Sequence, residues 1–293
     1  MTASKKHHYI PRFYLTGFTD SNNQYYVFDK QTKKIWLTTP ENSFAENHRN
    51  TGIVVDQNTS EIHKYDMPEE MLAHFDSRSA KAVYDIRNST IDDDMLTVER
   101  LYALRFFIIS TFWRTPANDH IRKDIINSHS FEDLGFGFFN KGKRLADVEK
   151  TMMDIDLWHK MYPTLLPMVS FSERYKRNNS GDFKLYYRSG LAHVVTDNPI
   201  ILQEFKDFSS LNEELIFPIS SKVFIIATSR YKPRHLPPAF NLKMDTLLFD
   251  NAHRYVACSN KDYLLLLANH VGSFMAEPGF NFMLKDDIFG YFY

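Results

Sequence analysis

The sequence predicts an α+β fold, in which an N-terminal hairpin and a helical bundle pack on a C-terminal mixed or antiparallel sheet. Apolar residues recur at three- and four-residue steps between residues 68 and 161, whereas short aromatic and β-branched runs dominate residues 183–258. Helical and extended segments therefore come in blocks, without the alternation that builds a parallel α/β sheet. Because no linker rich in Pro, Gly or Ser separates the blocks, we expect one interlocked domain over residues 1–293, helical from about 60 to 165 and β-rich from about 166 to 293.

A hairpin is predicted near the N-terminus. Residues 24–28 and 34–37 are aromatic and β-branched, and the polar residues 29–32 between them form a plausible turn. Residues 38–58 are rich in Asn, Thr, Glu and Asp with weak periodicity, so we expect them to be irregular.

Helical periodicity follows in four segments, at residues 68–86, 91–113, 121–126 and 147–161. Pro68 suits a first helical position, and the length of the second segment indicates a central helix. Pro116 is expected to interrupt that helix, and Pro163 to end the fourth segment.

The last third of the chain reads as a sheet and a helix. Residues 183–187 and 192–196 flank Arg188–Leu191 and predict a hairpin. Further short strands are predicted at residues 199–202, 215–217, 223–227 and 254–258, before a helix over residues 262–274.

Composition excludes several classes of protein. The 35 basic and 36 acidic residues leave a net charge of −1, which excludes a polybasic, histone-like protein. The single cysteine, Cys258, excludes an intramolecular disulfide and a Cys-rich zinc site, and it fits a reducing cytosol. Residues 1–8 lack the apolar segment of a signal peptide, and the apolar runs 104–113 and 263–268 are too short to cross a bilayer. We expect a cytoplasmic protein with no membrane partner; a protein partner and the oligomeric state stay open.

The most specific local pattern is HHYIPRFYL, residues 7–15. His7 and His8 can transfer a proton near neutral pH, and a neutral imidazole can bind a metal. Arg12 offers a rigid fork to phosphate or carboxylate. A structural interpretation is equally open, in which the aromatic side chains of this segment fill the core and the histidines bond to backbone groups.

Arg114 lies in the run Trp113-Arg114-Thr115-Pro116, at the end of the predicted central helix. A guanidinium at this point needs a partner, because burying it unpaired is costly. We expect Arg114 either to pair with an acid such as Glu70 or Asp76, or to bind an anion.

Asp197 and Asn198 precede Pro199, between two strand-like runs. This pattern places both side chains at a strand end, where sheets commonly present functional groups. An Asx-type turn, in which the same side chains satisfy backbone groups, is the commoner outcome.

Metal and nucleic-acid signals are dispersed. The chain has no His-Glu-x-x-His pattern and no cysteine pair, so a divalent metal would need scattered ligands such as His7, His8, Glu70 and Asp197. Basic residues interleaved with tyrosines at 174–177 and 230–234 are typical of surfaces that stack nucleic-acid bases, and equally of solvated faces.

Together, these three motifs resemble an uncharacterised bacterial family, domain-of-unknown-function family 4238. The resemblance is carried by residues 7–15, Trp113–Pro116 and the run Thr196-Asp197-Asn198-Pro199; Phe217-Pro218-Ile219-Ser220 and Asn251 also fit. The chain departs from the family pattern at Asp76, where glutamate is more usual, and at Thr196, where serine is. The resemblance implies one domain with a shared site formed by His7 or His8, Arg12, Arg114, Asp197 and Asn198. It implies no particular reaction.

Two classes of function stay open. In the first, the protein is a nuclease-like hydrolase of a phosphodiester or a nucleotide, as an effector or toxin in bacterial conflict or phage defence. A histidine would transfer the proton, Arg12 and Arg114 would stabilise phosphorane charge, and Asp197 with Asn198 would orient an imidazole or bind a metal.

The alternative is a non-catalytic sensor or binding module, in which Arg12 and Arg114 clamp an anionic ligand or a partner protein. Both classes predict that His8, Arg12, Arg114 and Asp197 surround one solvent-reachable cavity. If every motif is architectural instead, function lies in a surface interaction.

Overall fold

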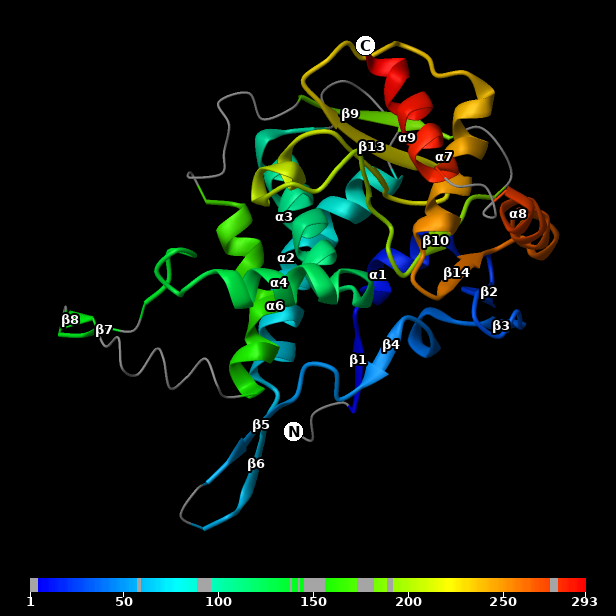
Figure 1. Cartoon of the computed structure of the whole chain (residues 1–293). Coiled ribbons are helices and arrows are strands. Elements are labelled where there is room, and N and C mark those ends of the chain that lie inside the picture. The colour runs from blue at the N-terminus through cyan, green and yellow to red at the C-terminus, as the bar shows by residue number, and fades with distance from the viewer. Residues whose placement is uncertain are drawn as a thin grey trace.

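The computed structural model confirms the α+β class (Figure 1). It describes residues 5–56, 59–88, 96–137, 139–141, 143–144, 156–172, 182–188, 192–274 and 279–293. In this part of the chain the strands pair antiparallel, which decides between the mixed and antiparallel sheets that the sequence left open.

The helical part consists of α2 (Met67–Asn88), α3 (Val98–Arg114), α4 (Asp119–Ser128) and α6 (Asp156–Ser170). Helices α2, α3 and α6 pack against one another. The predicted helices at 68–86 and 121–126 are confirmed, as is the second one from residue 98 on; residues 91–95 lie outside the described residues. Pro116 ends α3 at Arg114 as expected, because the residue before a proline is held extended and Thr115 has φ −74° and ψ 141°.

The expectation that Pro163 ends the fourth helix is wrong. Helix α6 continues through Pro163 and Pro167, and residues 147–155 of the predicted segment lie outside the described residues. A proline inside a helix costs about 3 kcal/mol or more. Each large apolar side chain that becomes fully buried contributes about 1.5–3 kcal/mol in the opposite direction. Leu166, Val169 and Tyr162 are all at least 96% buried in the core, so tertiary packing outweighs the helix-breaking preference.

Two four-stranded sheets form the β-rich part. The first has the order β10-β14-β2-β3 and consists of β10 (Val195–Thr196), β14 (Tyr255–Cys258), β2 (Tyr25–Asp29) and β3 (Ile35–Thr38). The second has the order β11-β12-β13-β9 and consists of β11 (Ile201–Leu202), β12 (Leu215–Pro218), β13 (Val223–Thr228) and β9 (Asp182–Tyr187). The N-terminal hairpin therefore pairs with strands from the C-terminal half of the chain.

The predicted hairpin over residues 183–196 is wrong. Strand β9 pairs with β13, and β10 pairs with β14 in the other sheet; of the expected turn, residues 189–191 lie outside the described residues. The pairing follows from burial on both faces of the second sheet. Side chains alternate along a strand. The Leu185 side chain therefore packs in the core shared with α2, α3 and α6, and the Tyr186 side chain packs in the core on the opposite face of the sheet.

The second core is covered by α7 (Pro238–Asn251), α8 (Lys261–Phe274) and α9 (Phe280–Phe289) (Figure 1). Helix α8 confirms the predicted C-terminal helix. Helix α7 could not be predicted from the sequence, because its residues 244–249 are all buried and their apolar pattern has no helical period.

Short elements frame the N-terminal region, partly against the expectation of an irregular segment at 38–58. Strand β1 (Lys6–His8) pairs with β4 (Ala45–Asn47), and β5 (Gly52–Val55) pairs with β6 (Ile62–Tyr65) in a hairpin that projects from the helices (Figure 1). Helix α1 (Arg12–Leu15) follows β1, and β7 (Phe139–Asn140) pairs with β8 (Lys143–Arg144).

Candidate functional site

The side chains of the two histidines in strand β1 lie on opposite faces of the strand. Because side chains alternate along a strand, Lys6 and His8 share one face and His7 takes the other. Lys6 and His8 both line a cavity, whereas the His7 side chain is fully buried away from it. The sequence left open a functional and a structural role for the two adjacent histidines. In the structure His7 takes the structural role and His8 lines the cavity.

The environment of His7 explains its structural place. Its Nδ1 accepts a hydrogen bond from the backbone N–H of Asn50 at 3.0 Å, and it lies 3.7 Å from Oε2 of Glu69. Glu69 is itself held by the Asn50 side-chain amide at 2.7 Å. These bonds tie β1 to the loop after β4 and to the start of α2.

Helix α1 places Arg12 at the mouth of the same cavity. Pro11 precedes the helix with φ −63°, and Arg12 is its first residue and is exposed. Tyr14, two residues later, is fully buried and donates from its hydroxyl to the Pro218 carbonyl at 2.7 Å. The opening motif therefore anchors the segment with its aromatic side chains, as its structural interpretation predicts, and presents Arg12 outward.

Arg114 is buried and only partly paired. Its side chain is 1% exposed, and its Nη1 donates to Asp76 Oδ1 at 2.9 Å. Its Nε and Nη2 are buried and have no hydrogen-bond partner among the described residues. Of the two roles that the sequence predicts for Arg114, pairing with Asp76 is confirmed. The other role, binding of an anion, stays a prediction.

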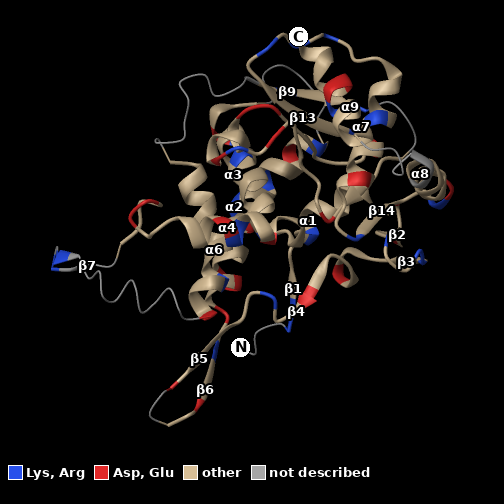
Figure 2. Ribbon diagram, viewed as in Figure 1, with Lys and Arg blue, Asp and Glu red and all other residues tan. Residues whose placement is uncertain are grey.

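The cavity that these residues line has a volume of about 630 Å³. The basic and imidazole side chains Lys6, His8, Arg12 and Arg114 and the acidic side chains Glu41, Glu69 and Asp76 line it, with Ser77, Thr16 and apolar residues between them. Several lining residues, among them Arg12, Glu41 and Ser77, are exposed, so the cavity opens to solvent. Basic and acidic residues are interspersed over the whole ribbon (Figure 2). The basic groups that line this cavity are therefore not part of a larger basic surface of the described residues.

Two lining groups have shifted pKa values. Burial lowers the pKa of His8 below 6.5, and the charge of Arg12 acts in the same direction. The His8 Nε2 lies 3.2 Å from the Pro40 carbonyl, which can only accept, so in the neutral ring Nε2 carries the proton and Nδ1 is the basic atom. Burial raises the pKa of Asp76 above 3.8, against the opposing charge of Arg114.

Asp197 and Asn198 do not reach this cavity, so the prediction that Asp197 helps to surround it is wrong. The Asp197 carboxylate accepts from the backbone N–H groups of His253, Arg254 and Tyr255 at 2.7–2.8 Å. Asn198 donates from its side-chain amide to the Asn251 carbonyl at 3.1 Å. Both side chains satisfy backbone groups, as the alternative predicted, but these groups belong to the distant connection from α7 to β14 and not to a local Asx-type turn. Burial raises the pKa of Asp197 above 3.8 despite the three N–H donors.

No metal-ligand cluster is found among the described residues, which contain no group of three or more His, Cys, Asp or Glu side chains placed to hold an ion. His7, His8, Glu70 and Asp197 are therefore not assembled into the dispersed site that a divalent metal would need. Of the two basic and tyrosine-rich runs, residues 174–177 lie outside the described residues.

Sequence inspection missed Glu69 and Ser77 as residues of the cavity. Both lie on the side of α2 that also carries Ala73, Asp76 and Ala80. These positions recur at three- to four-residue steps, and several are small, which leaves space beside the helix. This run of small and acidic residues on α2 could have indicated a cavity. It becomes informative only when α1 and β1 are known to lie opposite this side of α2.

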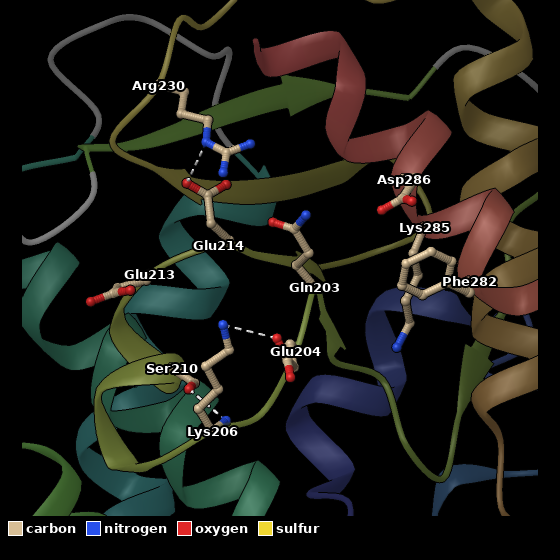
Figure 3. A pocket seen from close by; sticks show the side chains of 10 residues that line it. All are labelled: Gln203, Glu204, Lys206, Ser210, Glu213, Glu214, Arg230, Phe282, Lys285 and Asp286. Atoms are coloured by element: carbon tan, nitrogen blue, oxygen red, sulfur yellow. Dashed lines mark hydrogen bonds and ion pairs between the residues drawn. The ribbon is translucent and has the colours of Figure 1, made fainter.

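A second cavity, of about 620 Å³, lies between α9 and the edge of the second sheet (Figure 3). Two of its three basic side chains, Arg230 and Lys206, lie beside acidic partners, and Lys285 is the third. Arg230 Nε lies 3.5 Å from Glu214 Oε1, and Lys206 Nζ lies 3.0 Å from Glu204 Oε2. Glu213 and Asp286 add further negative charge. This cavity is therefore less suited to an anion than the one that contains Arg114.

Fold and site together define an α+β protein with an arginine-lined, solvent-reachable cavity between its N-terminal segment and α2. Residues 6–262 match the family described as "Protein of unknown function (DUF4238)", so the chain belongs to this family, as its motifs indicated. Comparison with curated proteins and with solved structures found no match. In the part of the chain that the structure describes, none of the helices combines the length and apolar character needed to cross a membrane.

Proposed function

We propose that this protein binds a phosphate group in the cavity of Arg12 and Arg114 and hydrolyses a phosphodiester or a nucleotide there. The observation that carries the proposal is Arg114, a buried guanidinium with one ion pair and two buried donors that have no partner in the described part of the chain. An unsatisfied buried donor costs about 1–3 kcal/mol, and more when it is charged. An anion that accepts from Nε and Nη2 removes this cost, and the planar fork of arginine matches phosphate oxygens.

The neighbouring groups support binding of the same anion. The Arg12 side chain makes no hydrogen bond or ion pair with any described residue, so its guanidinium can contact a phosphate at the cavity mouth without losing a partner. Lys6 lies on the same strand face as His8 and donates to the Glu41 carbonyl at 3.2 Å, which keeps its charge beside the cavity. Asp76 acts as a positioning residue, because it holds Arg114 in place.

His8 supplies the proton transfer in the proposed reaction. Its lowered pKa keeps the imidazole neutral at pH 7, so Nδ1 can take the proton of an attacking water. The water oxygen forms a bond to phosphorus as the bond to the leaving oxygen breaks, and the leaving oxygen takes a proton from the solvent that reaches the cavity. Arg12 and Arg114 stabilise the negative charge that develops on the non-bridging oxygens.

The test is cleavage by the purified protein, with RNA, DNA and nucleotides incubated across a panel of divalent metals. Replacing a general base typically lowers the rate 10²–10⁴-fold, so His8→Gln should lower kcat by about 100-fold or more. Arg12→Ala should weaken substrate binding. His235→Gln and Arg234→Ala are matched controls, because both residues are exposed and neither lines the cavity. Melting curves check that each variant folds, and intact substrates under all conditions would contradict hydrolysis.

The ion pair between Arg114 and Asp76 favours a second candidate, a non-catalytic sensor or binding module for an anionic ligand. Asp76 already occupies one side of the guanidinium, and Glu41 and Glu69 also line the cavity, so a ligand would compete with resident acids and exchange readily. Thermal shift and calorimetry with phosphate and nucleotides distinguish the two candidates. Binding with no turnover in any metal would select the sensor.

A further inference from the structure

A smaller hollow adjoins the candidate site along α2. It has a volume of about 420 Å³ and is lined by Phe13, Thr16, Ala80, Lys81, Tyr84 and Arg87. Phe13, Thr16 and Ala80 also line the cavity of Arg114, so the two hollows share a wall. Helices α1 and α2 contact each other here, and the two hollows follow one another along α2 as one groove.

The chemistry changes along this groove. The end at Arg114 holds charged and imidazole groups, whereas the end at Arg87 holds two aromatic rings and a third arginine. Tyr84 is 59% exposed, and the Arg87 guanidinium lies 5.6 Å from the centre of its ring. Exposed aromatic rings and arginine planes are the groups on which nucleic-acid bases stack.

Arg87 is held in this position by α1 and the turn after it. Its Nη1 donates to the Thr16 hydroxyl at 2.9 Å and to the Phe13 carbonyl at 3.3 Å. Gly17 leaves the space for this approach, because a Cβ there would lie 3.2 Å from the Arg87 Cδ and 3.1 Å from the Ser220 Cβ. The aromatic end of the groove is therefore built by the same N-terminal segment that presents Arg12.

We propose that the ligand is an oligonucleotide whose phosphate lies at Arg12 and Arg114 and whose neighbouring base stacks on Tyr84. The inference rests on the proposed function, because it assigns the substrate class of that site. Asp76 and Tyr84 are eight residues apart on α2, which is roughly 12 Å at 1.5 Å per residue. A phosphate ion cannot span this distance, whereas an extended dinucleotide can.

The experiment is calorimetric titration with inorganic phosphate and with a phosphorothioate-linked dinucleotide, which resists hydrolysis. The dinucleotide should bind about tenfold more tightly than phosphate or better, as expected when one base stacks. Tyr84→Leu should remove this difference and leave phosphate binding unchanged, and Tyr84→Trp should retain it. Tyr231→Leu is the control, because Tyr231 is 67% exposed and does not line the groove.

Each outcome has a separate meaning. Equal affinities for phosphate and dinucleotide, or a preference that survives Tyr84→Leu, would overturn the stacking site while leaving the proposed phosphate site intact. Binding of neither compound would overturn the proposed function and, with it, this inference.

Discussion

Neighbouring residues in this chain have opposite roles because of local geometry. His7 and His8 are adjacent in the sequence, yet strand alternation buries one beside Asn50 and places the other in the cavity. Arg12 and Tyr14 divide in the same way on the single turn of α1, with Arg12 exposed and Tyr14 fully buried. A pattern of adjacent polar residues therefore does not mean that all of them belong to one site.

The first prediction concerns the titration of His8. Its imidazole should titrate below pH 6.5 because burial and the charge of Arg12 both disfavour the protonated ring. Arg12→Ala removes one of these two causes, so the midpoint should move upward. NMR detection of the His8 ring signals measures both values without any substrate. Arg234→Ala, a distant exposed arginine, should leave the midpoint unchanged; an equal midpoint in Arg12→Ala would contradict the prediction.

The second prediction concerns Asp245, which is fully buried in the core on the far face of the second sheet. It accepts from Arg188, and from His193 Nδ1 and the Tyr263 hydroxyl, each at 2.7 Å. Burial acts to raise the pKa of Asp245, but the charge of Arg188 and the hydrogen bonds together hold it below 3.8. A carboxylate with a lowered pKa stabilises the fold at neutral pH, and this contribution is lost as the pH falls through the folded-state value.

Asp245→Asn should therefore lower the free energy of unfolding by about 3–5 kcal/mol at pH 7, because it leaves Arg188 buried without a counter-charge. Urea unfolding measures the loss. Asp287→Asn is the control: this carboxylate pairs with Lys243 at the surface, where its side chain is 48% exposed, and its loss should cost less than about 1 kcal/mol. Equal effects of the two substitutions would contradict the role of burial.

At the scale of elements, close contact between β5 and α6 holds the base of the projecting hairpin. Gly52 is buried in β5, and the two elements pack directly together. A Cβ at Gly52 would lie 2.7 Å from the Cα of Leu157, a distance at which backbone must move. Glycine is required here for close approach and not for an unusual φ.

Gly52→Ala should lower the free energy of unfolding by about 1–3 kcal/mol, the usual cost of overpacking. Chemical denaturation gives the value. At Gly290 a Cβ would meet nothing within 4 Å, and φ is −59°, so Gly290→Ala should be neutral or slightly stabilising. If Gly52→Ala left the free energy of unfolding unchanged, β5 and α6 would be able to separate without cost.

At the scale of the whole molecule, one core joins distant parts of the chain. Tyr14, Ile109, Leu166 and Phe217 belong to the same buried cluster, although they come from the N-terminal segment, two helices and the second sheet. Strand β2 of the N-terminal hairpin also pairs along β14. An interface of this kind is expected to unfold as a unit.

The single cysteine provides the measurement. Cys258 lies in β14 and is fully buried, so a thiol reagent reports on the β-rich part, while the far-ultraviolet dichroism signal reports mainly on the helices. Both signals should change over the same range of urea concentration. Labelling of Cys258 before the helical signal falls would indicate two independently stable parts.

The elements of the fold that could be predicted are those whose formation is decided by nearby residues in the sequence. Helix α2 and strands β12 and β13 were predicted because their apolar periods reflect one buried helix face and short buried runs. The path of α6 through Pro163 and the pairing of β9 with β13 were not, because burial against distant segments decided both. For the site, the sequence supplied His8, Arg12 and Arg114 and the option of a pair with Asp76. It could not exclude Asp197, whose backbone partners lie more than fifty residues away.

The sequence by itself determined the α+β class, the membership in the DUF4238 family and three of the four basic or imidazole side chains of the cavity, because residue type and periodicity are properties of the chain. Only the tertiary structure decided which histidine lines that cavity and that two Arg114 donors have no partner among the residues that the structure describes. The direction in which a side chain points, and whether its polar atoms find hydrogen-bond partners, depend on what packs against it. Here α1, α2 and α3 meet from separate regions of the chain.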